Sequence, residues 1–317
     1  MLFPFSLLFL ALVALRRTLY RVGILRSEGL PVPVVIVGNI TVGGSGKTPL
    51  TIHLVLALRA LGRHPGIVSR GYRGNATSAT EVFVGSDPAA VGDEALLLAR
   101  RAGCPVFVGR DRLAAARALL VRYPQCDVIL ADDGLQHYRL RRNVEIAVFD
   151  QRGVMNGWWL PAGPLREPVA RLAQVDAVVL NGRAVPPAPA LDRPVFVMRL
   201  LDNGFHRLDD PRVNCVPADL AGLKLHAVAG IGAPQRFFDR LREMGLDFAR
   251  HSFDDHYEFR VDDLVFGGDA ILTTEKDAVK LERLSLSLPV WVLPVTADVS
   301  PDLAAFVLEK LNGHPSA

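Results

Sequence analysis

The chain has 317 residues, enough for a substantial core, and half of its residues are hydrophobic. Its formal net charge is only +3, which gives no reason to expect a nucleic-acid partner. The mixed charges and the lack of internal repeats exclude a disordered or a repeat protein. The cysteines, Cys104, Cys126 and Cys215, form no CxxC pair, so they indicate neither a zinc site nor a disulfide framework and fit a reducing compartment.

Residues 1–15 are almost wholly apolar, and Arg16 and Arg17 follow them. A secretory signal would have its positive charge before the apolar run and a small-residue cleavage site after it, and neither is present. A helix of this length rises about 1.5 Å per residue and falls short of a hydrocarbon core about 30 Å thick. We therefore expect residues 1–28 to form a membrane-associated helix inserted in one leaflet, with its arginines among anionic headgroups. The alternative is a helix packed on the protein's own core, since buried helices are also apolar all round.

A strand-like run at residues 34–37 leads into a glycine-rich turn that ends in Gly46, Lys47 and Thr48. Small residues let successive backbone N–H groups converge on a polyphosphate, Lys47 can reach its β and γ oxygens, and the Thr48 hydroxyl can ligate Mg²⁺. A helix predicted at residues 50–61 would present its N-terminus to the anion. The residues expected to bind the nucleotide are Thr41, Val42, Gly43, Gly44, Ser45, Gly46, Lys47 and Thr48. Thr41 stands where the full P-loop motif has glycine, and a glycine-rich turn with a chance lysine is the alternative.

Apolar strand-like runs alternate with helical segments, which predicts an α/β fold with a doubly wound, mostly parallel sheet like that of P-loop NTPases. The runs lie at residues 34–37, 66–69, 82–84, 106–108, 128–130, 146–149 and 177–180, with helices at 50–61, 93–102 and 111–123. The kinase-like core is thus expected over residues 29–185. A proline-rich stretch marks a linker at 186–205, and a smaller α/β lobe is expected over 206–317, with a substrate cleft between the lobes.

A second apolar strand, at residues 128–130, ends in Asp132 and Asp133. Carboxylates at the end of a buried strand are the expected partners of a phosphate loop, because Mg²⁺ prefers hard oxygen ligands. The pair Asp-Asp before Gly134 is otherwise common in plain turns. If a helix begins near Gly134, His137 shares a face with Asp133, as a substrate contact or as a structural histidine.

Six motifs resemble, in order and spacing, those of the tetraacyldisaccharide 4′-kinases. They are GGSGKTP at 43–49, SRGYRG at 69–74, GDE at 92–94, DDGLQH at 132–137, GPLREP at 163–168 and TTEKDA at 273–278. The resemblance spans the chain and accommodates Thr41. It implies transfer of the γ-phosphate of ATP to the 4′-hydroxyl of an acylated glucosamine disaccharide 1-phosphate, forming lipid IVA on the route to lipid A. It also implies a peripheral, monotopic enzyme at the cytoplasmic face of the bacterial inner membrane.

The resemblance also assigns roles to residues. It implies that Asp93 activates the sugar hydroxyl with His256 beside it, and Lys47 completes the catalytic set; the residues alone make Asp93 simply an acid at a helix N-terminus. The candidate Mg²⁺ ligands are Thr48, Asp132, Asp133 and Glu167. The candidate substrate contacts are Arg70, Tyr72, His137 and Arg166.

Three further segments have two interpretations each. Trp158 and Trp159 either dip into the membrane interface or pack in the core. Residues 273–277 either approach the adenine or ribose, or cap a helix through Thr274 and Asp277. For the whole chain, the alternative is a membrane-associated P-loop ATPase or GTPase switch or chaperone. No Asn-Lys-x-Asp guanine-reading segment is visible, and residues 43–47 lack the additional early lysine of partition ATPases. No obligate protein partner is implied.

Overall fold

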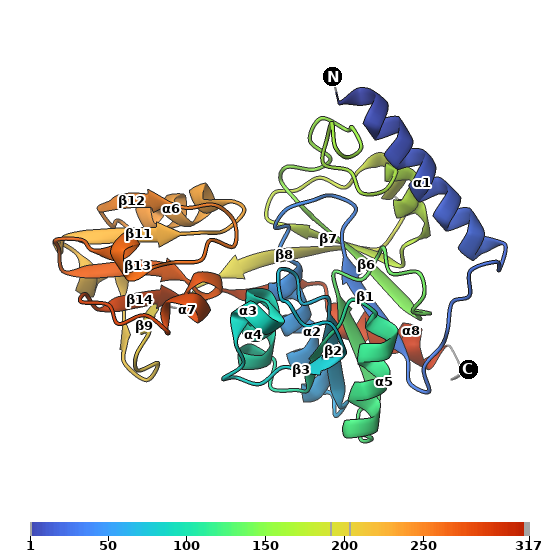
Figure 1. Ribbon diagram of the computed structural model, residues 1–317, viewed down its shortest axis with the longest axis horizontal. Coiled ribbons are helices and arrows are strands. Elements are labelled where there is room, and N and C mark those ends of the chain that lie inside the picture. Colours follow the sequence, from blue (N-terminus) through green and yellow to red (C-terminus); the bar gives the residue numbers. More distant parts are fainter. Residues whose placement is uncertain (1, 191, 203, 314–317) are drawn as a thin grey trace.

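The computed structural model describes residues 2–190, 192–202 and 204–313. It contains two sheets, each covered by helices, which lie beside one another (Figure 1). We call the nine-stranded sheet with its helices the first lobe and the six-stranded sheet with its helices the second lobe. The predicted α/β class, with a mostly parallel first sheet and a smaller second α/β unit, is confirmed.

The first sheet has the order β15-β8-β7-β6-β1-β5-β2-β4-β3. Its strands are β1 (Val34–Gly38), β2 (Pro65–Ser69), β3 (Thr80–Glu81), β4 (Val106–Val108), β5 (Val128–Asp132), β6 (Val144–Asp150), β7 (Ala177–Asn181), β8 (Val195–Leu201) and β15 (Thr296–Ser300). The strands from β8 to β4 are parallel, and β15 and β3 are antiparallel edges. Because β1 and β5 are parallel neighbours, with Val37 opposite Asp132, the phosphate loop and the Asp pair emerge at the same edge.

Helices cover both faces of the first sheet, which explains why its strands are apolar throughout. Val35 and Val37 of β1 pack in the core under α2 (Lys47–Ala60), α4 (Asp93–Arg101) and α8 (Leu303–Asn312). Val34 and Ile36 pack in the opposite core with α5 (Arg112–Arg122). The short α3 (Pro88–Val91) precedes α4. Short 3₁₀ helices lie at Val169–Gln174, Ala188–Ala190, Pro217–Leu220 and Val261–Leu264.

The second sheet has the order β10-β9-β14-β13-β11-β12. Its strands are β9 (Phe205–Arg207), β10 (Asn214–Cys215), β11 (Leu225–Ala229), β12 (Phe248–Ser252), β13 (Ala270–Thr274) and β14 (Val290–Leu293), and its helices are α6 (Pro234–Glu243) and α7 (Glu275–Leu281). The strands from β12 to β14 are parallel, and β9 and β10 add an antiparallel edge. Phe237, Phe238 and Leu241 of α6 pack against the sheet.

The lobe boundaries differ from the expected ones. The expected linker, 186–205, contains β8, which belongs to the first sheet, and the expected second lobe, 206–317, ends with β15 and α8, which also belong to the first lobe. Leu200 of β8 lies opposite Ala297 of β15, so the chain leaves the first lobe along β8 and returns along β15 (Figure 1). The proline-rich stretch marks only the place where the chain leaves the first lobe. The return along β15 was not predicted, because alternate residues of this strand are exposed and it lacks a continuous apolar run.

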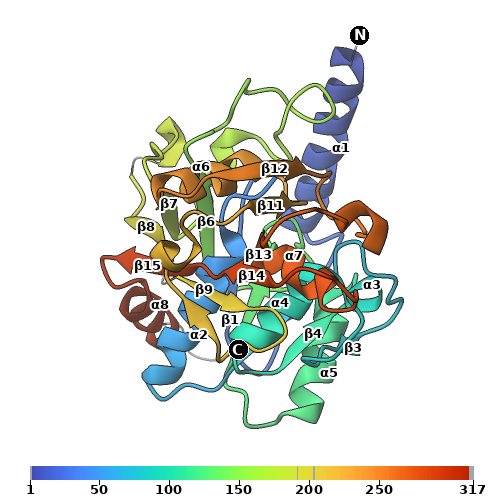
Figure 2. The same ribbon diagram turned by 90° about the vertical axis from the view of Figure 1, so that its left-hand side faces the viewer.

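The N-terminal helix α1 (Phe3–Arg21) runs along the outside of the first lobe in both views (Figures 1 and 2). Of its residues only Ser6 is buried, and the Ser6 hydroxyl donates to the Trp159 carbonyl at 2.9 Å. The Phe3 and Trp158 rings meet edge to face at 5.0 Å, with Trp158 45 % exposed, whereas Trp159 packs against the core. Among the described residues α1 is the one helix long and apolar enough to cross a membrane. It is therefore not the buried core helix of the alternative interpretation.

Candidate active site

The glycine-rich loop is shaped from within by asparagines that the sequence did not single out. Gly46 has φ 97°, and a Cβ there would lie 2.6 Å from Asn181 Nδ2, so both conformation and space require glycine. Asn181 donates to the Ser45 carbonyl at 3.1 Å, and Asn39 donates to the Ser45 hydroxyl at 3.1 Å. The loop is thus preformed at the N-terminus of α2, as a phosphate site requires.

The first part of the loop is fixed by the GPLREP segment. Thr41 is buried and bridges to Leu165, and the Val42 N–H donates to the Pro164 carbonyl at 2.9 Å. The Val42 N–H is therefore already used within the protein. Backbone donors for a phosphate come from the later loop residues, which begin at Gly43.

Lys47, Asp133 and Arg166 form one ionic group beside the loop. The Lys47 ammonium lies 3.6 Å from Asp133 Oδ1 and 3.4 Å from Asn39 Oδ1, and Arg166 Nη1 donates to both Asp133 oxygens at 3.0 and 2.8 Å. Burial opposes ionisation of Asp133, but Lys47 and Arg166 outweigh it and lower its pKa. Asp133 is held as a carboxylate in a left-handed turn with φ 51°, which aspartate tolerates better than most residues.

Asp132 is the last residue of β5 and is buried behind the loop. Its Oδ1 accepts a hydrogen bond from the Thr51 hydroxyl of α2 at 2.9 Å. Burial, followed by the charge of Glu94, raises the pKa of Asp132 to about 7 in spite of Lys47. A divalent cation would favour the ionised form.

The residues around the loop fit Mg²⁺. Thr48 at the start of α2 and Asp132 and Asp133 at the end of β5 offer hard oxygen donors. Within the described ranges no group of three or more His, Cys, Asp and Glu side chains could hold a metal ion by itself. Mg²⁺ usually binds through one or two protein oxygens together with phosphate oxygens and water.

Glu167 is oriented differently from the other candidate ligands. Its buried carboxylate accepts hydrogen bonds from Gln136 Nε2 at 2.7 Å and from the Tyr138 hydroxyl, and Arg171 Nε lies 3.6 Å away. Gln136 Nε2 also donates to the Asn39 carbonyl at 3.0 Å. These contacts link the Glu167 carboxylate to the end of β1 through Gln136, so it is placed to support that strand.

Asp93 and His256 meet although they come from different lobes. His256 Nδ1 lies 2.8 and 2.9 Å from the two carboxylate oxygens of Asp93, and both side chains are at most 7 % exposed. Burial raises the pKa of Asp93, but the hydrogen bond from His256 and the charge of Lys276 outweigh it and lower the pKa. His256 has φ 63°, a left-handed conformation that is uncommon for non-glycine residues and clusters at functional sites.

Lys276 joins this pair and was not singled out by the sequence. Its ammonium lies 3.2 Å from His256 Nε2, 3.0 Å from Glu94 Oε1 and 3.1 Å from Asp255 Oδ1. An ammonium can only donate, so His256 Nε2 accepts, and the imidazole proton is on Nδ1 and donates to Asp93. Burial lowers the pKa of Lys276, but the carboxylates of Glu94, Asp93 and Asp255 outweigh it and raise the pKa.

The TTEKDA motif places Lys276 through a helix cap. The Thr274 hydroxyl accepts from the Asp277 N–H at 3.2 Å, which is the capping interpretation of residues 273–277. Asp277 is fully buried and also accepts from the Gly230 N–H at 3.0 Å. The motif thus starts α7 so that Lys276 faces the Asp93–His256 pair.

Two of the four candidate substrate residues lie close to the charged groups of the site: Tyr72 beside His256 and Arg166 beside Asp133. The Tyr72 ring lies 5.2 Å from the His256 ring, and a Cβ on Gly74 would lie 2.5 Å from the Ala90 carbonyl, so the SRGYRG segment packs against the turn before Asp93. Arg166 is paired with Asp133. Exposed Arg70 follows β2 near Arg112, a buried residue that the sequence did not single out and that donates to the Asp133 carbonyl at 3.3 Å.

His137 lies apart from the Asp93–His256 pair. Residues 134–139 form turns and not the helix expected near Gly134, because hydrogen bonds such as His137 N–H to the Gly134 carbonyl close short loops. The His137 ring faces Asp111 at the start of α5, with Nε2 to Oδ1 3.6 Å. Burial and neighbouring Arg112 lower the pKa of His137 to about 4, so the ring is neutral.

Comparisons with known proteins agree with this architecture. Residues 1–312 match the family described as tetraacyldisaccharide-1-P 4′-kinase. The chain is 52 % identical to the tetraacyldisaccharide 4′-kinase of Azoarcus sp. over 319 residues, which cover 100 % of this chain and 93 % of that protein. It is 50 % identical to the enzyme of Chromobacterium violaceum, with 98 % and 93 % covered.

A solved structure is similar along the whole chain. It is the crystal structure of LpxK from Aquifex aeolicus in complex with ATP, with a TM-score of 0.82, 28 % sequence identity and 98 % of each chain covered. Both the sequence and the fold therefore point to one family. The chain belongs to the tetraacyldisaccharide 4′-kinases.

Proposed function

We propose that this chain transfers the γ-phosphate of ATP to the 4′-hydroxyl of a tetraacyldisaccharide 1-phosphate, which forms lipid IVA in lipid A biosynthesis. The observation that carries the proposal is the buried Asp93–His256 pair, 2.8 Å apart and assembled from both lobes. Glu94 links the pair to the phosphate loop, since it contacts Lys276 and its charge acts on Asp132. A membrane-associated nucleotide switch would have no use for such a pair, and family membership also favours the kinase.

The geometry supports Asp93 as the proton acceptor and His256 as the residue that orients it. Ionised Asp93 takes the proton of the attacking hydroxyl as the new P–O bond forms and ADP leaves, and His256 keeps the carboxylate oriented through its Nδ1–H. Phosphoryl transfer needs mainly positioning and neutralisation of charge on the phosphate oxygens. Lys47 and the loop N–H groups supply both. Mg²⁺ held by Thr48, Asp132 and Asp133 would neutralise further charge.

Label transfer tests the proposal directly. Incubation of the full chain with γ-labelled ATP and the acylated disaccharide 1-phosphate is expected to place label in the lipid, at the 4′ position. Release of labelled inorganic phosphate without label in the lipid would instead support a dimerising ATPase switch. In that case the rate per chain would rise with protein concentration and would not depend on the lipid.

Replacement of Lys276 tests the assignment of Asp93 as the base. In Lys276→Gln the positive charge that lowers the pKa of Asp93 is lost, so this pKa rises. Activity that requires ionised Asp93 then begins to fall at a higher pH than in the wild type, so the acidic limb of the kcat/KM profile moves to higher pH. Lys276→Arg keeps the charge and is expected to keep the limb in place.

The matched control is Lys224→Gln, which removes an exposed lysine of the same lobe. Its pH profile is expected to equal that of the wild type. If the Lys276→Gln profile also keeps the wild-type acidic limb, Lys276 does not act on Asp93 and the assignment of the base fails.

We infer that α1 holds the enzyme on the cytoplasmic leaflet of the inner membrane, where an acylated acceptor would reside. The support is the exposed apolar surface of the helix. Its exposed large apolar residues, from 46 to 62 % accessible, are Phe3, Phe5, Leu7, Leu8, Leu12 and Leu15. Arg16 and Arg17 follow at the level of the headgroups.

Deletion of residues 1–15 is expected to move the protein to the soluble fraction and raise the KM for vesicle-presented lipid, with ATP affinity unchanged. Each buried CH₂ contributes about 0.8 kcal/mol and each basic residue near the surface about 1 kcal/mol, so salt alone is not expected to release the full chain. Sedimentation in high salt and in detergent measures this. A truncated protein that still sediments and keeps wild-type kinetics contradicts the anchor.

A further inference from the structure

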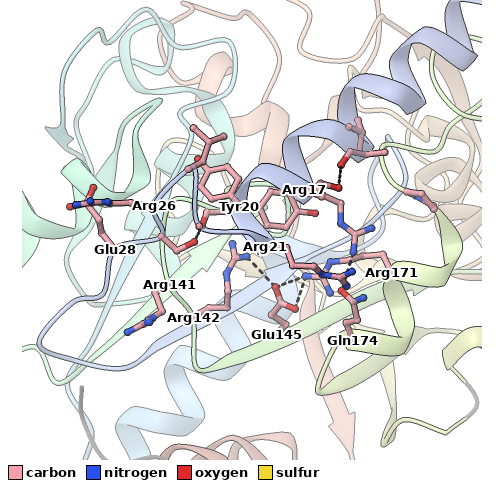
Figure 3. A pocket seen from close by; sticks show the side chains of 18 of the residues that line it. Arg17, Tyr20, Arg21, Arg26, Glu28, Arg141, Arg142, Glu145, Arg171 and Gln174 are labelled. Atoms are coloured by element: carbon pink, nitrogen blue, oxygen red, sulfur yellow. Dashed lines mark hydrogen bonds and ion pairs between the residues drawn. The ribbon is translucent and has the colours of Figure 1, made fainter.

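A cavity of about 1070 Å³ lies between the C-terminal half of α1 and the start of β6 (Figure 3). Its walls come from α1, from residues 23–28 after it, from residues 138–145 at the start of β6 and from residues 168–176. The cavity is rich in arginine side chains, namely Arg17, Arg21, Arg26, Arg141, Arg142 and Arg171. Figure 3 shows Arg17, Arg142 and Arg171 gathered around Glu145, with Arg26 and Arg141 at the opposite side.

The cavity carries an excess of positive charge because its carboxylates already have cationic partners. Glu145 pairs with Arg171 at 2.5 and 2.6 Å and with Arg142 at 3.4 Å. Glu28 pairs with Arg117 and Arg139, which do not line the cavity, at 2.9 and 3.0 Å. Asp176 lies 3.6 Å from Lys310.

Several guanidinium groups that line the cavity have N–H donors without a partner among the described residues. Among residues 2–190, 192–202 and 204–313, the side chains of Arg21, Arg26 and Arg141 make no ion pair or hydrogen bond. Arg21, Arg26 and Arg141 are exposed and line the cavity, so their donor forks are accessible to a ligand. Phosphate oxygens match the planar arginine fork. The cavity therefore favours a phosphate anion.

The surroundings of the cavity narrow down the kind of phosphate. Val22, Ile24 and Leu25 lie between Arg21 and Arg26 and are 60, 70 and 38 % exposed. Val13 and Ala14 of α1 also line the cavity. A free phosphate or a nucleotide gains nothing from such a rim. A molecule with a phosphate and acyl chains would use both surfaces.

The cavity is separate from the candidate active site. It adjoins Glu145 near the amino end of β6, whereas the phosphate loop follows the carboxyl end of β1. Because β1 and β6 are parallel neighbours, with Val35 opposite Val144, the cavity and the phosphate loop lie at opposite ends of these strands. We propose that this cavity binds the phosphate headgroup of an anionic phospholipid of the membrane, with its acyl chains against the exposed apolar residues Val22, Ile24 and Leu25. This rests on the proposed membrane association.

Native mass spectrometry of the full chain in a neutral detergent tests the site by counting retained lipid. Phosphatidylglycerol is expected to remain bound at one molecule per chain, and phosphatidylcholine is not. In the double variant Arg21→Gln, Arg141→Gln the affinity for phosphatidylglycerol is expected to fall at least about tenfold, since two guanidinium groups that can donate to the phosphate oxygens are lost. The control double variant Arg122→Gln, Arg250→Gln removes two exposed arginines outside the cavity and is expected to bind as the wild type does.

Three outcomes would overturn the proposal. Equal loss in both double variants would mean attraction by net charge alone. Displacement of phosphatidylglycerol by equimolar inorganic phosphate would assign the cavity to a free anion. Displacement by the acylated disaccharide 1-phosphate would make the cavity part of the acceptor site. The anchor hypothesis is tested separately, by sedimentation of the truncated chain. Its failure would not change the detergent assay, because that assay contains no membrane.

Discussion

Replacing Lys47 with alanine is expected to lower the rate of phosphoryl transfer by about 10³-fold or more while the chain stays folded. Lys47 begins α2, its side chain is 11 % exposed, and its ammonium is directed at Asn39 Oδ1 and Asp133 Oδ1. The substitution removes the point charge at the phosphate oxygens. It keeps α2 intact because alanine is the best helix former, and Asp133 keeps Arg166 as a partner.

Single-turnover transfer to the lipid measures the first effect, and circular dichroism with thermal unfolding measures the second. Lys47→Arg serves as the charge-matched control and is expected to recover part of the rate, since a guanidinium does not reproduce the compact ammonium. Near-normal turnover of Lys47→Ala would remove the phosphate-loop assignment.

The second large effect is expected at the pair that joins the lobes. Asp93→Asn is expected to lower kcat by about 10²–10⁴-fold with little change in ATP affinity, because only the proton acceptor is lost. Asparagine is isosteric and its oxygen still accepts the hydrogen bond from His256 Nδ1. At position 256 the matching substitution is His256→Asn, because asparagine tolerates the left-handed φ of 63° at this residue.

The double variant Asp93→Asn, His256→Asn tests whether the two residues act as one unit or contribute independently. If Asp93 and His256 act as one unit, the double variant is about as slow as the slower single variant. Full multiplication of the two losses would mean that the residues act separately, and His256 would then not be the support of Asp93. ATP binding, measured by equilibrium titration, is the control for all three proteins.

The sequence predicted those parts of the site that follow from contiguous residues. The strand at 34–37, the glycines before Lys47 and the carboxylates after 128–130 determine where the loop and the Asp pair emerge, and the structure has both at one edge of the sheet. The resemblance to a family supplied Asp93 and His256, since the sequence context of Asp93 alone indicates only a helix start. Their roles remain predictions until the variants are measured.

What the sequence did not predict depends on contacts between distant segments. Lys276 approaches His256 only because α7 docks against α4 across the lobes, and nothing in TTEKDA beyond its cap indicates this partner. Asn181 reaches the Ser45 carbonyl because β7 lies two strands from β1 in the sheet order. The strands β9, β10 and β15 are short, antiparallel edges, and such edges carry little of the apolar signal that marks buried parallel strands.

The return of the chain along β15 has a consequence for how the protein is made. Leu303, Val307 and Leu311 of α8 lie in the same apolar cluster as Leu54 and Leu58 of α2, the helix that begins at the phosphate loop. A ribosome delivers α8 only after every residue of the second lobe. The growing chain therefore holds one side of its nucleotide-binding core open to solvent until α8 has been synthesised and packs against α2.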